Sequence, residues 1–203
     1  DWSSDVCSSD LSDLHRRTIE LIAGQTQAAD RGEVTSQEAK LLVGILLSAA
    51  ADTTVLTLAN TIRAFSEFPD QYQLVRSDPA LVRAAFEESL RWDSPSRMAG
   101  RIAMKDIEID GYLIPAGERC GLMFAAANRD PRRWEAPTTL SLGRPKAMEH
   151  LAFGRGAHVC AGAPLARVEV RVMLEQLLSQ TRAIRLSEAH HGPEGARSFD
   201  VVD

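Results

Sequence analysis

The sequence lacks the cysteine patterns of a zinc site or a disulfide framework. Its three cysteines, Cys7, Cys120 and Cys160, are far apart and odd in number, and no C-x-x-C pair occurs. An excess of positive charge is also missing, and the net charge of −5 argues against a nucleic acid or an anionic membrane as the partner. No basic region followed by an apolar core stands at the start, as a signal peptide requires. We therefore expect a protein of the reducing cytoplasm.

One apolar segment is long enough to cross a membrane. From Leu41 to Ile62 the only charged residue is Asp52, and the span would suffice for a bilayer. However, Asp52 and several threonines fill its second half, and a carboxylate in the middle of a span is costly. The segment therefore predicts a buried helix of a soluble protein, with a membrane span as the alternative.

The first residues differ in composition from the rest. Residues 1–13 are a Ser/Asp-rich stretch without a period or an initiating Met. We interpret them as a remnant of cloning or sequence assembly, the alternative being a disordered native linker. Under either interpretation Cys7 has no role, and residues 14–203 are predicted to belong to one domain.

Helices dominate the next part of the chain. The pattern predicts a helix over His15–Asp30, and Thr35 with Glu38 forms a capping box that opens a long helix ending before Pro69. Shorter helices are expected around residues 71–76 and 79–92, and a further helix near Pro164.

Between these helices the sequence predicts a small β region. Alternating apolar residues around Asp110-Gly111 indicate a hairpin, and a strand follows over about 119–124. A long irregular stretch from about residue 128 to 162 indicates a functional loop. The fold class is therefore mainly α, with a small β-hairpin region.

The strongest functional signal is a glycine-rich segment around Cys160. Residues 153–162 read FGRGAHVCAG and stand directly before a predicted helix. Glycines let the backbone approach a flat ligand closely. The helix N-terminus supplies a positive field and free N–H groups, which favour a thiolate. A shielded, ionised cysteine suits a metal ligand, so Cys160 is the candidate.

This segment resembles the haem-binding signature F-G-x-G-x-[HR]-x-C-x-G of the cytochromes P-450. The resemblance implies the C-terminal half of a cytochrome P-450 fold, with haem b (iron protoporphyrin IX) as the cofactor. It implies Cys160 as the axial thiolate, which favours O–O cleavage. It also implies that Phe153 packs against the haem, and the signature includes Gly154 and Gly162 among the cofactor-binding residues.

Two residues of the signature, His158 and Arg155, have open roles. In isolation His158 is a candidate metal ligand, but the resemblance implies that it binds a haem propionate. Arg155 is either a second propionate partner or a surface residue that faces a redox protein. Arg101 begins the segment R-x-A-x-x-D-x-x-I-x-G, which resembles the family's propionate-binding arginine, and a guanidinium suits a carboxylate. A solvated charge at a strand end is the alternative for Arg101.

A second motif lies in the middle of the long helix. Asp52 and Thr53 are poor helix-interior residues, which suggests a use for them. The stretch AAADTT resembles the family's [AG]-G-x-[DE]-T-[ST], which lines the oxygen side of the haem. The resemblance implies that Thr53 hydrogen-bonds dioxygen and that Asp52 relays protons. Ala50 stands where the family usually has Gly and is expected to tighten the pocket slightly. An N-cap or a kink at Asp52 is the alternative.

A third motif is the i,i+3 pair Glu88 and Arg91. It resembles the family's E-x-x-R, which implies a buried ion pair on the proximal side of the haem. In the family a second arginine completes this network, but Thr139 stands in its place here. Arg144 and Arg133 are the candidates to replace it.

The resemblance covers residues 14–203 and implies an oxidoreductase. The expected activity is monooxygenation, in which one oxygen atom of O2 enters an apolar or aromatic small molecule. Electrons would come indirectly from NAD(P)H, through a ferredoxin or flavodoxin-type partner. The N-terminal sheet and the final hairpin of the family are expected to be missing. A peroxygenase of the same fold and a truncated, catalytically incompetent fragment are the alternatives.

Overall fold

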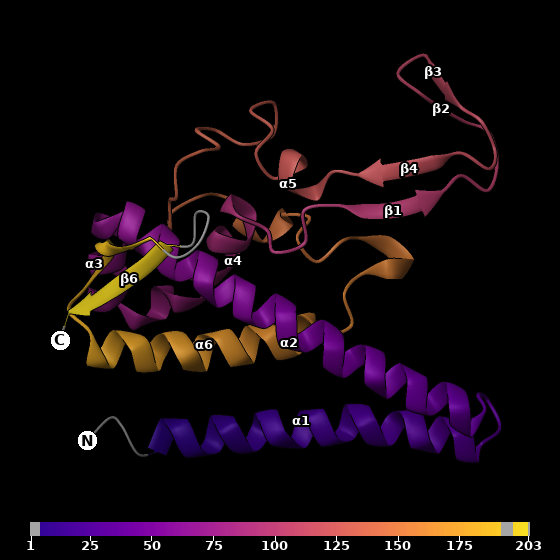
Figure 1. The fold of residues 1–203 in the computed structure, drawn as a ribbon, viewed down its shortest axis with the longest axis horizontal. Coiled ribbons are helices and arrows are strands. Elements are labelled where there is room, and N and C mark those ends of the chain that lie inside the picture. Colours follow the sequence, from indigo (N-terminus) through magenta and orange to yellow (C-terminus); the bar gives the residue numbers. More distant parts are fainter. Residues whose placement is uncertain (1–4, 192–196, 203) are drawn as a thin grey trace.

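The computed structural model of the chain describes residues 5–191 and 197–202, which form a mostly helical structure with three two-stranded antiparallel sheets (Figure 1). The α-helices are α1 Asp5–Asp30, α2 Ser36–Glu67, α3 Pro69–Ser77, α4 Val82–Trp92, α5 Phe124–Ala127 and α6 Ala163–Gln180. The 3-10 helices are η1 Pro79–Leu81, η2 Ala147–Glu149 and η3 Gly156–His158. The strands are β1 Ala99–Ile102, β2 Ile107–Ile109, β3 Tyr112–Ile114, β4 Arg119–Leu122, β5 Ala183–His191 and β6 Arg197–Val202.

Local signals explain the ends of the first two helices. Helix α1 ends at Asp30 as predicted, but it begins at Asp5 rather than at His15. The origin of residues 1–13 stays a prediction. Helix α2 opens with the predicted capping box: the Thr35 amide donates to Glu38 Oε2 at 2.7 Å, and the Glu38 amide donates to Thr35 Oγ1 at 3.2 Å. It ends at Glu67, where Pro69 starts α3.

Helix α2 is only partly buried, which corrects the prediction of a buried helix. Its C-terminal half packs into the core through Thr61, Ala64 and Phe65. Only 6% of its most apolar 18-residue stretch is buried, and α2 is long and apolar enough to cross a membrane. Leu41 and Ile45 are among its exposed side chains. Apolar composition predicted burial, but nothing in the described part of the chain covers this face.

The core lies where the C-terminal half of α2 meets α3, α4 and α6. Aromatic rings pack at its centre, with Phe65 and Tyr72 edge to face at 5.3 Å between centroids. The fully buried apolar members are Ala64, Phe65, Tyr72, Val75, Val82, Ala85, Phe86, Leu90, Leu140, Val170 and Leu174. Helix α4 is buried along nearly its whole length, and backbone groups of the later loops hydrogen-bond to its side chains.

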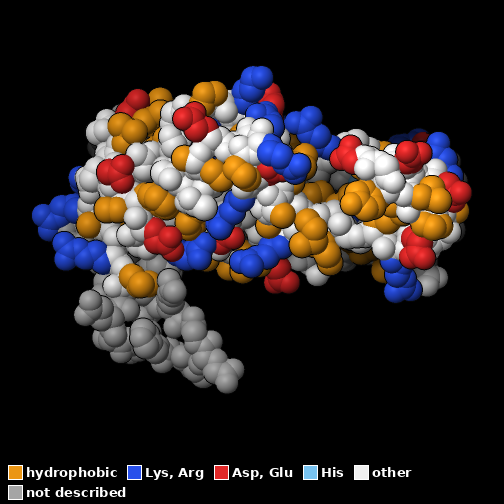
Figure 2. Space-filling model, turned by 90° about the horizontal axis from the view of Figure 1, so that it is seen from above, with side chains coloured by type: hydrophobic (Ala, Val, Ile, Leu, Met, Phe, Trp, Pro, Cys, Tyr) orange, Lys and Arg blue, Asp and Glu red, His pale blue; other side chains and the backbone are white. Residues whose placement is uncertain are grey.

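The β region forms an arm that projects from the helices (Figure 1). Strands β1 and β4 pair along its base, and β2 and β3 form the predicted hairpin at its tip. Asp110 has φ 51° and Gly111 has φ 80°, the left-handed conformations that the two-residue turn requires. Many apolar side chains of the arm are exposed, including Met104 and Tyr112, and Figure 2 shows apolar side chains among acidic and basic ones at this end of the molecule.

The described chain ends in a pair of strands, in which β5 pairs with β6 in antiparallel register, with Ala183 opposite Val202. The expectation that the final hairpin of the family is missing stays a prediction. The residues that connect the two strands, 192–196, lie outside the described part. Strand β5 also contacts α2 and α3.

Candidate functional site

The loop around Cys160 folds back on itself before α6 begins. Gly154 and Gly156 have φ of 68° and 73°, which side chains rarely adopt. A Cβ at Gly154 would also lie 3.4 Å from the carbonyl oxygen of His158. The Cys160 amide donates to the Phe153 carbonyl at 2.8 Å, which closes the loop. As a result the Cys160 thiol is free and exposed just before the N-terminus of α6.

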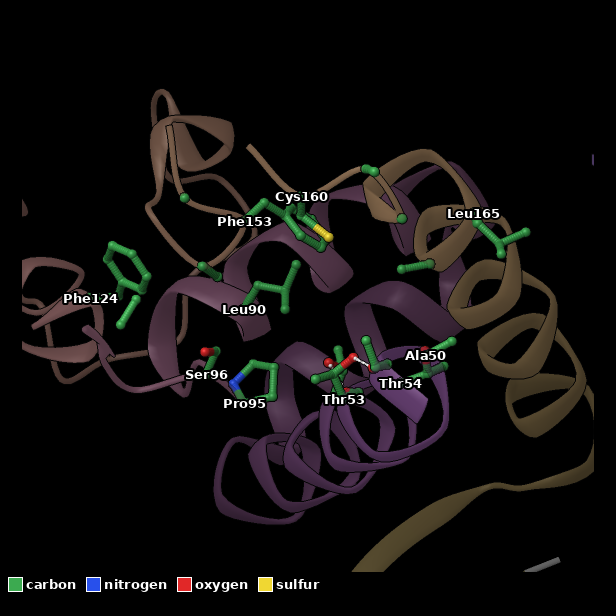
Figure 3. Close-up of a pocket in the computed structure, with 18 of the residues that line it drawn as sticks. Ala50, Thr53, Thr54, Leu90, Pro95, Ser96, Phe124, Phe153, Cys160 and Leu165 are labelled. Carbon is green, nitrogen blue, oxygen red and sulfur yellow. Dashed lines mark hydrogen bonds between the residues drawn. The ribbon is translucent and has the colours of Figure 1, made fainter. Parts of the chain in front are cut away.

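The thiol faces a cavity of about 370 Å³ that lies between this loop, α2 and α4. Figure 3 shows the Cys160 sulfur and the Phe153 ring on one side of the space, and Ala50, Thr53 and Thr54 on the other. The cavity has the size and the largely apolar wall of a small-molecule site. Eight of the site residues predicted from the sequence line it: Ala50, Thr53, Arg101, Phe153, Gly154, His158, Cys160 and Gly162.

The α2 wall stays helical despite its polar residues, because each threonine bonds back along the helix. Thr53 Oγ1 donates to the Ala49 carbonyl at 2.7 Å, and Thr57 Oγ1 donates to the Thr53 carbonyl at 2.7 Å. Neither an N-cap nor a helix break occurs at Asp52, since α2 is continuous there. Asp52 is exposed and is not among the residues that line the cavity.

A carboxylate that the sequence analysis missed lies at the side of the cavity. Glu169 of α6 accepts a hydrogen bond from the Thr54 hydroxyl at 3.3 Å, so it ties α6 to α2. Partial burial raises the pKa of Glu169, although the hydrogen bond from Thr54 acts in the opposite direction. The sequence did contain a signal for its position. Glu169 stands three residues after Ala166, a spacing that places both residues on one face of α6.

Arg155 lies apart from the cavity. It lines a separate surface hollow together with Arg133 and Trp134, and its Nη2 donates to the Glu149 carbonyl at 3.4 Å. Arg101 instead reaches the cavity wall, where Nη1 donates to the Gly100 carbonyl at 2.8 Å. The two arginines therefore have different surroundings, which the sequence motifs alone did not distinguish.

Below the cysteine loop, Glu88 and Arg91 form an ion pair whose side chains are fully buried. Arg91 donates from Nε to Glu88 Oε2 at 2.8 Å and from Nη2 to Oε1 at 2.9 Å. Arg144 adds a third charge-assisted bond, from Nε to Glu88 Oε1 at 2.8 Å. Arg91 and Arg144 both also donate to the carbonyl of Thr139. The residue in the place of the family arginine thus joins the network through its backbone.

We expect Arg144, and not Arg133, to supply the stabilisation that the second arginine provides in the family. Arg144 is nearly buried, and its loss in an Arg144→Gln variant should lower the free energy of unfolding by about 1.5–3 kcal/mol. Arg133→Gln is the matched control, because Arg133 pairs with Glu149 at the surface and should cost about 0–1 kcal/mol. Urea unfolding of both variants measures the difference, and equal costs would contradict the assignment.

The model of the cytochrome P-450 family matches residues 7–184 of the sequence. The chain belongs to the cytochrome P-450 family. This match and the fold confirm the expected mainly α cytochrome P-450 architecture, of which the chain is a part.

Individual cytochromes P-450 are similar over most of the chain. CYP199A2 of Rhodopseudomonas palustris is 42% identical over 159 residues, which cover 78% of this chain and 38% of that protein. The biotin biosynthesis cytochrome P-450 of Bacillus subtilis is 34% identical over 169 residues, 83% of this chain and 42% of that protein. The crystal structure of P450BioI with an acyl carrier protein ligated to hexadec-9Z-enoic acid superposes with a TM-score of 0.76 and 32% identity, covering 90% of this chain and 50% of that one. The chain thus spans half or less of each of these relatives.

The residues around the cavity fit the haem that the cytochrome P-450 family implies. Cys160 offers a free thiol at one wall, Ala49 and Ala50 leave space at the opposite wall, and Arg101 and His158 line the cavity as candidate partners for carboxylates. Among the described residues, no group of three or more His, Cys, Asp or Glu side chains could hold a metal ion. A haem would need no such group, because the Cys160 thiolate alone would be the protein ligand to its iron.

Proposed function

We propose that this chain is the haem-binding part of a monooxygenase that inserts one oxygen atom of O2 into an apolar small molecule. The observation that carries the proposal is the free Cys160 thiol, which faces the small and hydroxylic residues of α2 across a largely apolar cavity. A thiolate-ligated haem supplies the oxygen chemistry, because the thiolate favours O–O cleavage.

Each wall of the cavity has a distinct task in this proposal. Cys160 would bind the iron, and the Phe153 ring lines the cavity on the side of the sulfur. Arg101 and His158 would bind the haem carboxylates, as their place on the cavity wall allows. On the opposite wall the Thr53 hydroxyl, which bonds to the Ala49 carbonyl, is the group that would exchange this bond for one to a reacting oxygen. The small side chain of Ala50 leaves space for the haem at that wall.

The path of protons from Asp52 to Thr53 is indirect. Asp52 is exposed and outside the cavity lining, so it can deliver protons to Thr53 only through solvent or a side-chain movement. In this proposal Asp52 relays protons to Thr53 by one of these routes.

Electrons would arrive from NAD(P)H through a ferredoxin or flavodoxin-type partner. The exposed Arg155 is the candidate contact for such a partner, because it lies in a surface hollow with Arg133 and Glu149 rather than in the cavity. We therefore assign Arg155 to the surface and not to a propionate. We infer an apolar or aromatic substrate from the apolar residues Leu46, Leu90 and Phe124 of the cavity wall. The fatty acyl group bound by P450BioI is compatible with this class.

The main rival is a fragment that is incompetent by itself. Two observations favour it: the chain covers 38% of CYP199A2, and the apolar face of α2 is exposed. A peroxygenase is the second rival, and the position of Asp52 outside the cavity favours it, since peroxide already carries the protons that a relay would supply.

Haem titration of the purified 203-residue chain tests the proposal. After reduction under carbon monoxide, we expect the red-shifted Soret band of thiolate ligation. A chain that binds no haem, or binds it without this band, would favour the incompetent fragment. Product formation is then measured under two conditions. The first supplies O2, NAD(P)H and a ferredoxin system, and the second supplies hydrogen peroxide alone. We expect product only with the electron donor, and turnover with peroxide alone would favour the peroxygenase.

A further inference from the structure

Glu87, beside the ion pair described above, has a buried network of its own. Its side chain is 1% exposed, on the buried helix α4. While Glu88 faces Arg91 and Arg144, Glu87 accepts hydrogen bonds from two other elements. The two adjacent carboxylates therefore serve different parts of the fold.

The first partner of Glu87 is His150, which lies ten residues before the cysteine. Its ring is also 1% exposed, with Nε2 3.0 Å from Glu87 Oε2. The Ala152 amide donates to His150 Nδ1 at 3.1 Å. Because an amide can only donate, Nδ1 is the acceptor and Nε2 carries the hydrogen that Glu87 receives. His150 thus fixes the backbone at the start of the cysteine loop to α4.

The second partner is Arg167, which lies seven residues after the cysteine on α6. Its Nε donates to Glu87 Oε1 at 2.6 Å and its Nη2 to Oε2 at 3.2 Å, a forked contact. The guanidinium also lies over the Phe153 ring, 4.8 Å from the centroid. Phe153 in turn accepts the Cys160 amide at its carbonyl. A continuous series of contacts therefore leads from Glu87 to the backbone of the cysteine.

Glu87 carries its charge at neutral pH. Burial alone would raise the pKa of its carboxyl, but the hydrogen bonds from His150 and Arg167 and the charge of Arg167 outweigh this and hold the pKa below its ordinary value. A buried carboxylate that loses one partner is costly, so the arrangement resists displacement of either flank of the loop.

We propose that Glu87 is a positioning residue, which through His150 and Arg167 holds both flanks of the Cys160 loop at a fixed place on α4. The proposal does not need the haem, but its consequence for ligation rests on the proposed function. The alternative is a core ion pair that stabilises the whole fold without a particular effect on the loop.

Hydrogen exchange of the full 203-residue chain separates these two roles. A Glu87→Gln variant keeps the shape of the side chain and removes its charge. We expect the Cys160 amide to exchange at least about tenfold faster than in the unchanged chain, while the amide of Leu174, in the core part of α6, exchanges at an unchanged rate. Equal acceleration at both amides, or no acceleration at Cys160, would overturn the proposal.

Two further variants keep the test decisive. Glu149→Gln is the matched control, because Glu149 pairs with Arg133 at the surface, close in sequence to His150, and should leave both amides unchanged. If Glu87→Gln does not fold, Arg167→Gln takes its place, since Arg167 is 31% exposed and its loss leaves α4 intact. It should give the same local pattern, and uniform or absent acceleration would again overturn the proposal.

Haem ligation provides a second readout. In the reconstituted chain, Glu87→Gln should lower the fraction of haem that shows the thiolate-type band by at least about twofold, with the total haem bound little changed. If the unchanged chain binds no haem, the proposed function fails, but the exchange experiment still decides the role of Glu87.

Discussion

Replacing Cys160 with alanine should abolish the red-shifted Soret band of the reduced, carbon monoxide-bound chain. The reason is that, among the described residues that line the cavity, Cys160 is the only cysteine. Without its sulfur, the described cavity wall would offer no thiolate to the haem iron, and ligation by His158 would give a different spectrum. Absorption spectra of the two proteins at equal haem content measure the effect.

Cys120→Ala is the matched control. Cys120 lies on β4 in the arm, is only partly exposed, and is not part of the cavity wall. Its loss should leave the band in place. A thiolate band that survives in Cys160→Ala, or that disappears in Cys120→Ala, would show that the ligand assignment is wrong and would remove the basis of the proposed activity.

Removing the buried carboxylate in a Glu88→Ala variant should lower the free energy of unfolding by about 3–5 kcal/mol. Glu88 is fully buried and accepts hydrogen bonds from Arg91, from Arg144 and from the amide of Ser141 at 3.0 Å. Its loss leaves a buried guanidinium without its counter-charge, which is more costly than the loss of any single contact. Urea unfolding followed by circular dichroism measures the change.

The control for this variant is Glu33→Ala. Glu33 pairs with Arg31 at 2.6 Å, but both side chains are more than half exposed. Solvent screens such a pair, so the midpoint of unfolding should not change. A Glu88→Ala variant as stable as the control would mean that the network is not a stabilising element. Arg144 would then have no role to take over from the arginine that the family has at Thr139.

Patterns within a few neighbouring residues were sufficient for much of this protein. The capping box of Thr35 and Glu38, the turn at Asp110-Gly111 and the glycine-rich loop before α6 are determined by local hydrogen bonds and by backbone conformation. For the same reason the resemblance to the cytochromes P-450 was visible in the sequence, and the family match confirms it.

Contacts between distant residues were decided only by the tertiary structure. The sequence left Arg144 and Arg133 as equal candidates, and the packing of the long loop against α4 brought only Arg144 to Glu88. Nothing in the sequence indicated that Glu87 and Arg167, which are 80 residues apart, would form an ion pair.

Exposure was also beyond the reach of local patterns. The composition of helix α2 predicts a core helix, but its buried residues other than Ala39 all lie in its C-terminal half. Asp52 and Thr53 are neighbours in one motif, and the turn of the helix places Thr53 at the cavity and leaves Asp52 outside its lining. Sequence determines which elements form and which chemistry they carry. Only the packing of those elements decides which side chains meet, because such contacts depend on the relative placement of helices that no local pattern encodes.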